Sequence, residues 1–467
     1  MSKPTLPQGT RDFSPEIVRK RQYILNTLKQ VFEQCGYQPI ETPAIENLQT
    51  LMGKYGEEGD RLIFKILNNG LHEASKHEST RAALENVLSG KNDPKLTERA
   101  LRYDLTIPFA RFVVMHQNSL QFPFKRYQMQ SVWRADRPQK GRYREFWQCD
   151  CDVVGSNALI NEAELLYIYR EAFHRLKMPQ VVVRINSRKV LSGIAQYCDA
   201  ATQLSDLTIA IDKLDKIGLE GVEKELSAKN FNQEQIKALF SLIGIKDVDT
   251  LKAMFEAKNI QEGLIGIKEI EDTLLYHQSL AEAYWSQSSL QVDFTLARGL
   301  SYYTGIIVEV NCTAPEVSMG SIGGGGRYDD LTGLFGLKNL SGVGVSFGVD
   351  RIYDLMEQLE LFPKHLKTGT QIMLVNTGNE NEIYALGLLK ALRAEGIAAE
   401  IYPDVHKFDK QLKYIFNRNI PFALLIENDD RLHNLMRLKD FEKGTQEALS
   451  LEQLILFLKS TTSQEIY

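Results

Sequence analysis

The sequence has little cysteine and histidine, and neither residue is spaced as a metal or disulfide site would require. Its five cysteines are an odd number scattered along 467 residues, which is unlike the disulfide framework of a small secreted domain. Cys149 and Cys151 are too close together, and have the wrong neighbours, for a structural zinc site. The eight histidines show no ligand spacing. These absences favour an intracellular protein without structural disulfides or zinc.

Long hydrophobic runs are also absent. The N-terminal segment MSKPTLPQGTRDF contains no apolar run, and no segment approaches the length that a bilayer crossing needs. The net charge of −5 gives no general signal for nucleic-acid binding, so such contacts must use local basic patches. A chain of this length could hold about two to four domains. We therefore expect a cytoplasmic, multidomain protein with no membrane partner.

Basic side chains are concentrated in one stretch, residues 125–144. They are Lys125, Arg126, Arg134, Arg137, Lys140, Arg142 and Arg144, with Asp136 as the only acid. Both halves of the stretch alternate as strands do, and residues 135–143, which include a proline and a glycine, are typical of a connecting loop. Arginines at the tip of a hairpin present planar sets of donors to a phosphate. The stretch therefore predicts a phosphate-binding hairpin.

The returning strand of this hairpin, residues 145–154, carries a polar face. Alternation puts Gln148, Asp150 and Asp152 on one side, opposite a face rich in Trp, Cys and Val. Such a face predicts a polar pocket beside the phosphate site. The alternative is a solvated outer face of a sheet.

Periodicity divides the chain into four predicted parts: residues 1–189, 190–287, 288–362 and 370–467. The first part begins with an amphipathic helix from Ser14, with Gly36 after its end. Short strands are expected near residues 37–40, 62–67 and 101–106, and residues 70–98 are expected to form an exposed insertion. The second part has helical periodicity and reads as an insertion, because strands resume at residues 292–310 and 342–348 of the third part.

The fourth part alternates strands and helices, which predicts a small α/β domain with a largely parallel sheet. One helix is expected over residues 381–395, with Ile383, Leu386, Leu389 and Leu392 on its apolar side and Gly396 as its stop. Ser450 and Gln453 fit a capping box at the start of the last helix. No catalytic constellation is visible in this part, so binding is its expected role.

Two glycine-rich segments remain. Residues 322–329, IGGGGRYD, lack the Gly-Lys-Ser/Thr ending of a phosphate loop and do not open a helix as GxGxxG does. Bare backbone there predicts the close approach of a ligand or a neighbouring strand. Residues 342–352 read as a strand that runs into a helix with Arg351 in its first turns. Because the helix dipole opposes an arginine at that end, we expect an anionic partner there; the alternative is a surface arginine.

Several motifs together resemble one known family, the histidyl-tRNA synthetases of the class II aminoacyl-tRNA synthetases. They occur in family order and span nearly the whole chain. The motifs are PQGTRDF at 7–13, IETP ending at Pro43, LRYDLTIP at 101–108, WRADRPQKGRYREFWQCDCD at 133–152, LARGLSYYTG at 296–305, GGGRYD at 324–329 and GVDR at 348–351. Ser301 departs from the pattern, because the family usually has an acid there.

The resemblance implies a fold and a set of site residues. The fold is an α/β multidomain chain: a class II catalytic core built on an antiparallel sheet, a helical insertion and a C-terminal α/β domain of the anticodon-binding type. Arg134, Arg142 and Arg351 match residues that bind ATP, and Arg134 and Arg298 match those that act at the reacting phosphate. The residues that match the histidine site are Asp104, Thr106, Gln148, Asp152, Arg298, Tyr303 and Tyr328, with Arg327 helping to line the pocket.

The resemblance also implies an activity and partners. The activity is histidine–tRNA ligation, in which ATP and L-histidine form histidyl-adenylate and histidine is transferred to the 3′ end of tRNA(His). Mg²⁺ is expected to help neutralise the triphosphate, with its protein ligands unknown, and Pro43 matches the motif of a homodimer interface. The alternative is a noncatalytic, histidine-binding paralogue that serves as a regulatory subunit of histidine biosynthesis.

Overall fold

The computed structural model describes residues 3–139, 141–285, 288–297, 302–426, 433 and 435–463. The chain forms two compact units. One consists of residues 1–12 and 21–361, and the other of residues 13–20 and 362–467. The finer division of the first unit at residues 189 and 287 stays a prediction. None of the described helices combines the length and the apolar character that a membrane crossing needs.

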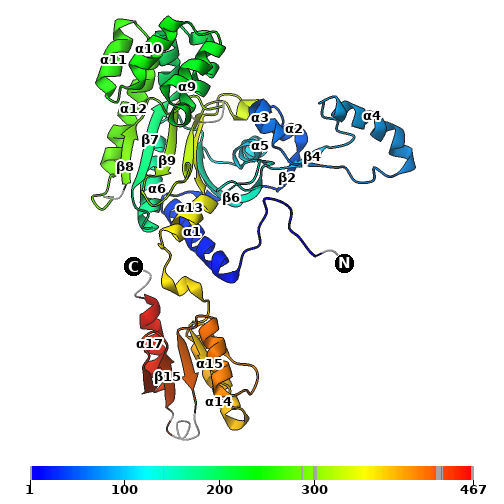
Figure 1. Ribbon diagram of the computed structural model, residues 1–467, viewed down its shortest axis with the longest axis vertical. Helices are drawn as coiled ribbons and strands as arrows, with labels where there is room; N and C mark the ends of the chain where they lie inside the picture. Colours follow the sequence, from blue (N-terminus) through cyan, green and yellow to red (C-terminus); the bar gives the residue numbers. More distant parts are fainter. Residues whose placement is uncertain are drawn as a thin grey trace. The chain divides into compact units, whose positions relative to one another are not determined.

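A sheet of eight strands forms the centre of the first unit (Figure 1). Its order is β1-β5-β6-β11-β10-β9-β7-β8. The pairs from β5 to β7 along this order are antiparallel, whereas β1–β5 and β7–β8 are parallel. The strands are β1 Gln38–Pro39, β5 Phe124–Trp133, β6 Glu145–Val154, β7 Val181–Ser187, β8 Ser288–Val292, β9 Ile306–Cys312, β10 Gly323–Tyr328 and β11 Gly342–Gly348. The expected antiparallel core and its hairpin, β5–β6, are confirmed.

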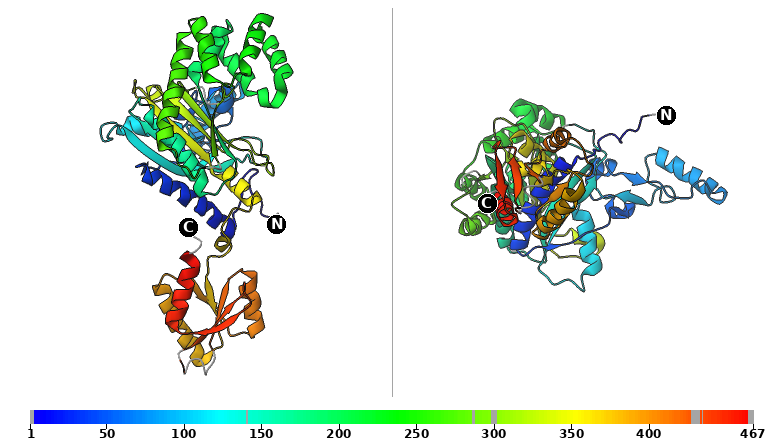
Figure 2. Two further views of the ribbon diagram at one scale, coloured as in Figure 1. Left: turned by 90° about the vertical axis from the view of Figure 1, so that its left-hand side faces the viewer. Right: turned by 90° about the horizontal axis from the view of Figure 1, so that it is seen from below.

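Two helices, α1 (Pro15–Gln34) and α6 (Ile160–Arg175), supply the side chains that cover one face of this sheet. Phe347 of β11 lies at the contact: its ring centre is 5.8 Å from that of Phe32 in α1 and 4.6 Å from that of Tyr169 in α6. Ser14 begins α1 as expected, because its Oγ accepts a bond of 3.4 Å from the Ile17 amide. Figure 2 shows α1, the dark blue helix, running along one side of this sheet.

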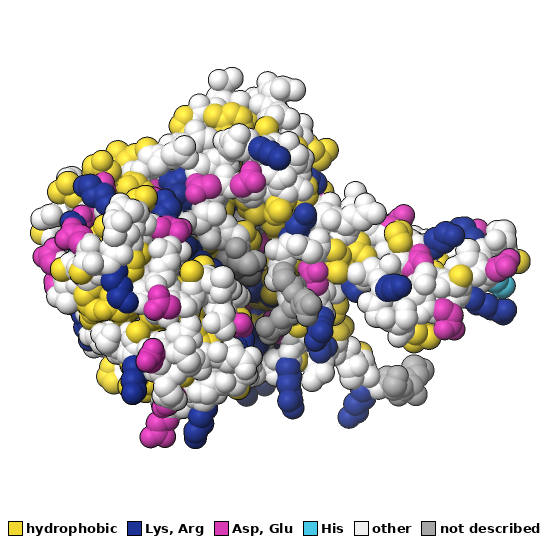
Figure 3. Space-filling model, turned by 90° about the horizontal axis from the view of Figure 1, so that it is seen from above, with side chains coloured by type: hydrophobic (Ala, Val, Ile, Leu, Met, Phe, Trp, Pro, Cys, Tyr) yellow, Lys and Arg dark blue, Asp and Glu magenta, His cyan; other side chains and the backbone are white. Residues whose placement is uncertain are grey.

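A smaller sheet, β2-β4-β3, lies beside the main one in the same unit. Its strands and the neighbouring helices are β2 Ile45–Asn47, β3 Lys65–Ile66, β4 Arg99–Leu101, α2 Leu48–Leu51, α3 Gly56–Arg61, η1 Ala74–Lys76, α4 His77–Leu88, α5 Thr106–His116 and η3 Thr332–Phe335. Helix α4 projects away from the sheet, which agrees with an exposed insertion at residues 70–98 (Figure 1). This projection carries both signs of charge (Figure 3).

The strand expected over residues 101–106 is largely wrong. Strand β4 ends at Leu101, and α5 already begins at Thr106. The cause is local, because Asp104 Oδ1 accepts the Ile107 amide at 3.2 Å, as a capping carboxylate does at a helix start. Strands expected within residues 292–310 are present at both ends of that range: β8 ends at Val292, and β9 begins at Ile306.

Helices follow β7 as the periodicity predicted. They are α7 Arg188–Tyr197, η2 Ala201–Gln203, α8 Leu204–Asp212, α9 Leu214–Ala228, α10 Gln233–Ile243, α11 Val248–Ala257 and α12 Gln261–Leu280. Helices α7 and α12 pack closely through Gly193 and Gly263, since a Cβ on Gly193 would lie 2.6 Å from the Gly263 Cα. Helix α13 (Val349–Gln358) follows β11 and lies beside α1, to which Asp350 is joined by an ion pair with Arg21.

The second unit is a small α/β domain, as expected. Its sheet has the order β13-β12-β14-β15-β16, in which the first three strands are parallel and the last two antiparallel. The elements are η4 Lys364–Lys367, β12 Ile372–Leu374, α14 Asn379–Ala394, β13 Ala399–Ile401, α15 Phe408–Asn417, β14 Phe422–Leu425, β15 Met436–Asp440, β16 Gln446–Leu449 and α17 Leu451–Ser463. The capping box is confirmed: Gln453 N donates to Ser450 Oγ at 3.3 Å and Ser450 N to Gln453 Oε1 at 2.9 Å.

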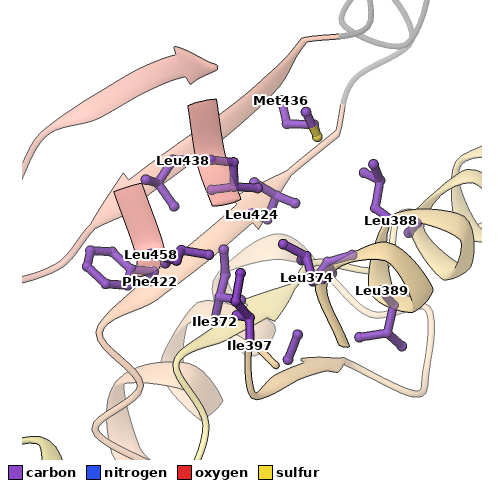
Figure 4. Packing of buried hydrophobic residues seen from close by; sticks show 14 of the residues in the cluster. Ile372, Leu374, Leu388, Leu389, Ile397, Phe422, Leu424, Met436, Leu438 and Leu458 are labelled. Atoms are coloured by element: carbon purple, nitrogen blue, oxygen red, sulfur yellow. The ribbon is translucent and has the colours of Figure 1, made fainter. Parts of the chain in front are cut away.

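Helices α14 and α17 cover one face of this second sheet through a continuous aliphatic core (Figure 4). The buried face of α14 differs from the expected one, because Ile383 is 75% exposed and Leu386 is 49% exposed. Leu389 and Leu392 are buried together with Ala385 and Leu388. These four positions follow the i, i+3, i+4, i+7 spacing of a single helical stripe, which the expected set did not. Ile415 of α15 packs on the opposite face.

Candidate active site

The polar side of the main sheet opens into a pocket of about 460 Å³. The hairpin β5–β6, the glycine strand β10 and the junction of β11 with α13 form most of its wall. Its lining residues are Tyr55, Gly59, Leu62, Tyr103, Arg134, Asp136, Gly141, Arg142, Tyr143, Phe146, Trp147, Gln148, Ser321, Ile322, Gly323, Gly324, Ser346, Gly348, Asp350 and Arg351. Arginines from two distant segments therefore meet at one cavity, as a site for a polyanion requires.

Arg134 is held at the pocket wall by its neighbours. Its Nε donates to the Tyr103 carbonyl at 3.1 Å, and its guanidinium carbon lies 4.3 Å from the centre of the Tyr103 ring and 5.2 Å from that of Phe146. A planar guanidinium between two rings has little freedom to rotate. No described residue takes its Nη nitrogens, so they are available to a ligand.

Arg351 and Arg142 line the same cavity in different ways. Arg351 Nη1 donates to the Ser321 carbonyl at 2.6 Å and its Nε to the Gly141 carbonyl at 3.1 Å, which joins α13 to the hairpin loop. The side chain of Arg142 is 50% exposed, and its Nη1 lies 3.8 Å from Asp136 Oδ1. An exposed pair at that distance is weak, so Arg142 can turn to a ligand at little cost.

Asp350 anchors this end of the pocket, and nothing in its local sequence had indicated it. Its Oδ1 accepts from Arg11 Nη2 at 2.5 Å and from Arg21, and its Oδ2 accepts the Trp147 amide at 3.0 Å. One carboxylate thereby joins the PQGTRDF segment, β6 and the first turn of α13. This explains how an N-terminal motif supports a pocket formed by residues more than a hundred positions away.

The polar face of β6 is buried, so a solvated outer face is excluded. Asp150 and Asp152 are both 3% exposed. In register, Asp152 faces Gly344 and Asp150 faces Ser346 of β11. Gln148 is the member of this face that reaches the pocket lining, where its Nε2 donates to Ser346 Oγ at 3.3 Å.

A buried acidic layer continues from this face. Tyr328 Oη donates to Asp152 Oδ1 at 2.6 Å, and Tyr55 Oη donates to Asp104 Oδ1 at 2.8 Å. Burial raises the pKa of the Tyr303 phenol, and the charges of Asp152, Asp150 and Asp104 raise it further. Asp104, Asp152, Tyr303 and Tyr328, all expected at the histidine site, therefore lie close together beside the pocket, whereas Gln148 lines the pocket itself. Thr106 begins α5 beside Asp104.

Of the expected residues, one is not described by the structure and one lies away from the pocket. Arg298, together with Ser301, lies outside the described residues. Arg327 points away from the pocket and forms a buried ion pair with Glu162, with Nε–Oε1 and Nη2–Oε2 distances of 2.5 and 2.7 Å, and its Nη1 donates to Ser341 Oγ at 2.6 Å. Arg327 therefore supports β10 instead of lining the pocket.

Glycines allow the strands to pack this closely. A Cβ on Gly325 would lie 2.1 Å from the Gly344 carbonyl oxygen, and one on Gly344 would lie 1.9 Å from Asp152 Oδ1. Gly323 and Gly324 meanwhile line the pocket. The close approach of a neighbouring strand, one of the two alternatives expected for this segment, is confirmed by these distances, and the approach of a ligand stays a prediction.

Burial dominates the electrostatics of the layer. It raises the pKa of Asp150 to about 7, an effect that Arg126 reduces and Asp152 increases. It also raises the pKa of Asp104 and Asp152. Because a buried carboxylate is stabilised by a cationic partner, a layer with this many acids suits a ligand that carries an ammonium group.

The raised pKa of Asp150 predicts a dependence of stability on pH. Its folded-state pKa lies above the unfolded value, so this group's contribution to stability falls as pH rises from about 4 to about 7. Asp150→Asn should therefore gain stability relative to the parent over that window, by at most about 1.4 kcal/mol per pH unit, and show a constant difference above it. Thermal unfolding midpoints measured between pH 5 and 8 test this.

The matched control is Asp249→Asn, since Asp249 is an exposed residue of α11. It gives the effect of removing an exposed carboxylate over the same window. A pH-independent difference between Asp150→Asn and the parent would mean that Asp150 is ionised throughout this window.

Comparison with known proteins gives the family. The profile described as Histidyl-tRNA synthetase matches residues 9–74 and 72–352. The chain belongs to this family. The profile described as Anticodon binding domain matches residues 371–461, which is most of the second unit. The two profiles together therefore cover most of both units.

Relatives and solved structures of the family agree over the full length. The chain is 50% identical to the histidine–tRNA ligase of Christiangramia forsetii over 98% of this chain and 99% of that protein. It is 48% identical to that of Bacteroides fragilis strain YCH46, over 97% and 98%. The crystal structure of histidyl-tRNA synthetase from Nostoc sp. PCC 7120 superposes with a TM-score of 0.83 at 29% identity, over 99% of this chain and 100% of that one. The class II α/β multidomain fold is thereby confirmed.

Proposed function

We propose that the protein is a histidine–tRNA ligase that uses ATP to activate L-histidine and then transfers histidine to the 3′ end of tRNA(His). The proposal rests on two neighbouring groups of residues: a cavity lined by Arg134 and Arg351, and a buried layer of acids that contains Asp104 and Asp152. The first suits a triphosphate and the second an amino acid with a cationic end. Family membership over both units supports the same conclusion.

The chemistry needs no nucleophile from the protein. The carboxylate of histidine attacks the α-phosphorus of ATP, which forms the mixed anhydride and releases pyrophosphate. A terminal ribose hydroxyl of the tRNA then attacks the carbonyl carbon, and AMP leaves. Both steps pass through states with increased negative charge on oxygen, which arginines fixed in advance stabilise.

The site residues divide between the two substrates. We assign Arg134 to the α-phosphate and the histidine carboxylate, and Arg142 and Arg351 to the far end of the triphosphate. Asp104 and Thr106 hold the α-amino group, and Gln148 lies near the carboxylate. Asp152 and Tyr303 read the imidazole, supported by Tyr328.

Arg298 is assigned, from its motif alone, to the α-phosphate beside the histidine. Together with Arg134 it would place two guanidinium groups at the reacting centre. This assignment rests on the LARGLSYYTG motif, because Arg298 is outside the described residues.

Mg²⁺ is proposed to arrive with the triphosphate. Among the described residues, no three or more His, Cys, Asp or Glu side chains are grouped as metal ligands. Asp350, a carboxylate of the pocket, is engaged by Arg11 and Arg21. Mg²⁺ commonly binds through phosphate oxygens and waters with few protein ligands, which fits such a pocket. When bound, it supplies neutralisation of phosphate charge.

The second unit is proposed to bind the anticodon of tRNA(His), and the protein to act as a cytoplasmic homodimer. The match to an anticodon-binding profile supports the first assignment. Pro43, the residue that matches the dimer motif, is exposed between β1 and β2 and thus accessible to a second copy. Light scattering coupled to size-exclusion chromatography measures whether the protein is dimeric.

The decisive experiment is histidine-dependent exchange of pyrophosphate into ATP, followed by charging of tRNA(His). Exchange that requires histidine and no other amino acid supports the ligase. Binding of histidine without exchange would support the alternative, a regulatory paralogue.

A structure from Bacillus halodurans titled as an ATP phosphoribosyltransferase regulatory subunit/histidyl-tRNA synthetase shares the fold, with a TM-score of 0.66 at 19% identity. The paired arginines of the pocket favour the ligase, because a histidine sensor has no need of a triphosphate site.

A further inference from the structure

Arg126 is a cation in the interior that the proposed reaction does not use. It is 0% exposed, and among the residues that the structure describes it is the largest fully buried side chain. It is absent from the lining of the pocket, so its guanidinium does not reach the substrates' phosphates. Burying a charge costs several kcal/mol unless partners compensate, so a structural reason for Arg126 must lie in its contacts.

The contacts of Arg126 converge on Asp152. The two residues are directly opposite in the β5–β6 register, and Arg126 Nη2 lies 2.6 Å from Asp152 Oδ2. The guanidinium carbon is 4.3 Å from the centre of the Phe109 ring in α5, and Nη1 donates weakly to Gln128 Oε1 at 3.3 Å. The Phe109 ring thus packs against the guanidinium, and Asp152 is the charged partner of the arginine.

Asp152 needs such a partner to remain an acceptor. Burial raises its pKa, and Arg126 and then the Tyr328 hydroxyl counteract this. An ionised carboxylate can accept from an imidazole N–H, whereas a protonated one would present its own proton instead. By keeping Asp152 ionised, Arg126 therefore determines whether this side chain accepts a hydrogen bond from a ring N–H or donates one to a ring nitrogen.

Arg126 also limits the movement of Asp152. Oδ2 is next to Arg126, and Oδ1 accepts from Tyr328 at 2.6 Å. On the other side, only the absence of a side chain at Gly344 leaves room for the carboxylate, since a Cβ there would lie 1.9 Å from Oδ1. Each oxygen keeps a further lone pair for a ligand, but the plane of the carboxylate is fixed by its two neighbours.

We propose that Arg126 is a positioning residue for amino-acid specificity: it holds Asp152 ionised and in a fixed orientation as the acceptor for a ring N–H of the substrate. The inference rests on the proposed function, in which Asp152 reads the imidazole. It adds that discrimination for histidine depends on a residue that touches no substrate. A ring isostere without an N–H, such as thienylalanine, should be rejected because it leaves this buried, ionised acceptor unpaired.

The test uses the full-length protein and pyrophosphate exchange. Arg126→Met removes the charge at similar length, and Arg126→Lys keeps it. Loss of the cationic partner of Asp152 should raise the KM for histidine about ten- to a hundredfold in Arg126→Met, with the KM for ATP changed less than about twofold. The preference for histidine over thienylalanine should fall in parallel. Arg126→Lys should recover part of both losses.

A double-mutant cycle separates positioning from general structural damage. Asp152→Asn leaves no carboxylate for Arg126 to hold. In that background, Arg126→Met should cause no further rise in the KM for histidine. The double variant also has no unpaired charge, so it is expected to fold even if Arg126→Met alone does not, and its comparison with Asp152→Asn then decides the question.

The outcomes distinguish the inference from the function on which it rests. If Arg126→Met leaves the KM for histidine unchanged, or raises it equally in the presence and absence of the Asp152 carboxylate, Arg126 does not act through Asp152 and the inference is wrong. If Asp152→Asn itself leaves the histidine requirement unchanged, the assignment of Asp152 in the proposed function is wrong.

Discussion

Arg134→Ala is expected to reduce the rate of adenylate formation by about 10² to 10³, which corresponds to about 3 to 4 kcal/mol of lost transition-state stabilisation. The affinity for histidine should also fall, because Arg134 is assigned to the histidine carboxylate too, but it should fall by less than the rate, because negative charge develops at the α-phosphate only during the reaction. The guanidinium is already oriented by Tyr103 and Phe146, so no reorganisation is needed in the transition state. Single-turnover formation of histidyl-adenylate at saturating ATP and histidine measures this rate.

Arg137→Ala is the matched control for Arg134→Ala. Arg137 belongs to the same hairpin loop, but it is exposed and does not line the pocket. The rate of adenylate formation should stay within about twofold of the parent in this variant, as for an ordinary surface substitution. Equal losses in the two variants would mean that the loop acts through its total charge, and an unchanged rate in Arg134→Ala would remove this residue from the mechanism.

The hairpin was predictable from the sequence because its determinants are local. Alternation of polar and apolar residues from 145 to 154 assigns the faces of β6, and the proline and glycine between the strands mark the loop. The same alternation predicted that Gln148, Asp150 and Asp152 share a face. Their burial, however, depends on β10 and β11 far along the chain, so the sequence left the solvated alternative open.

Other features depend on contacts between distant segments, and the sequence did not reveal them. Asp350 is a partner of Arg11, 339 positions away, and no local pattern indicates such a pair. The pairing of Arg126 with Asp152 could have been predicted by counting residues outward from the hairpin loop. The burial of Arg126 could not have been predicted in this way. On α14, two possible apolar stripes existed, and packing against β12 and β14 selected the one with Ala385 and Leu388.

The missed residues Asp350 and Arg126 share one feature: each is a buried charge that supports a polar part of the pocket. Asp350 supports the first turn of α13, from which Arg351 extends, and Arg126 lies behind Asp152. Each buried ion costs desolvation energy, so each is strongly destabilising when its partner is removed, by about 3 to 5 kcal/mol. A loss of activity after substitution of such a residue can result from destabilisation alone, so the KM for each substrate must be measured separately.

Deleting residues 370–467 should uncouple the two half-reactions. The deleted segment contains the whole second sheet with its own aliphatic core, whereas the candidate pocket belongs entirely to the first unit. Histidine-dependent pyrophosphate exchange should therefore persist within a few-fold of the parent. Charging of tRNA(His) should fall by at least about a hundredfold in kcat/KM, equivalent to about 2.8 kcal/mol of lost binding.

The deletion begins at residue 370 because the residues just before it contact α1. Arg19 Nε donates to the Leu366 carbonyl at 2.8 Å and its Nη2 to the Lys367 carbonyl at 2.7 Å. Ending the chain at residue 369 keeps both acceptors, so α1 loses neither bond. Light scattering of the truncated protein should show the same oligomeric state as the parent, which removes loss of a dimer as the cause of any loss of charging.

The salt dependence of charging gives an independent measurement of the same assignment. If the second unit contacts tRNA phosphates, the logarithm of kcat/KM for tRNA in the full-length protein should fall with the logarithm of salt concentration, because each neutralised phosphate releases counterions. The slope should be smaller in the truncated protein, which has lost those contacts. Unchanged charging by the truncated protein, with intact preference for the histidine anticodon, would mean that residues 370–467 have another partner.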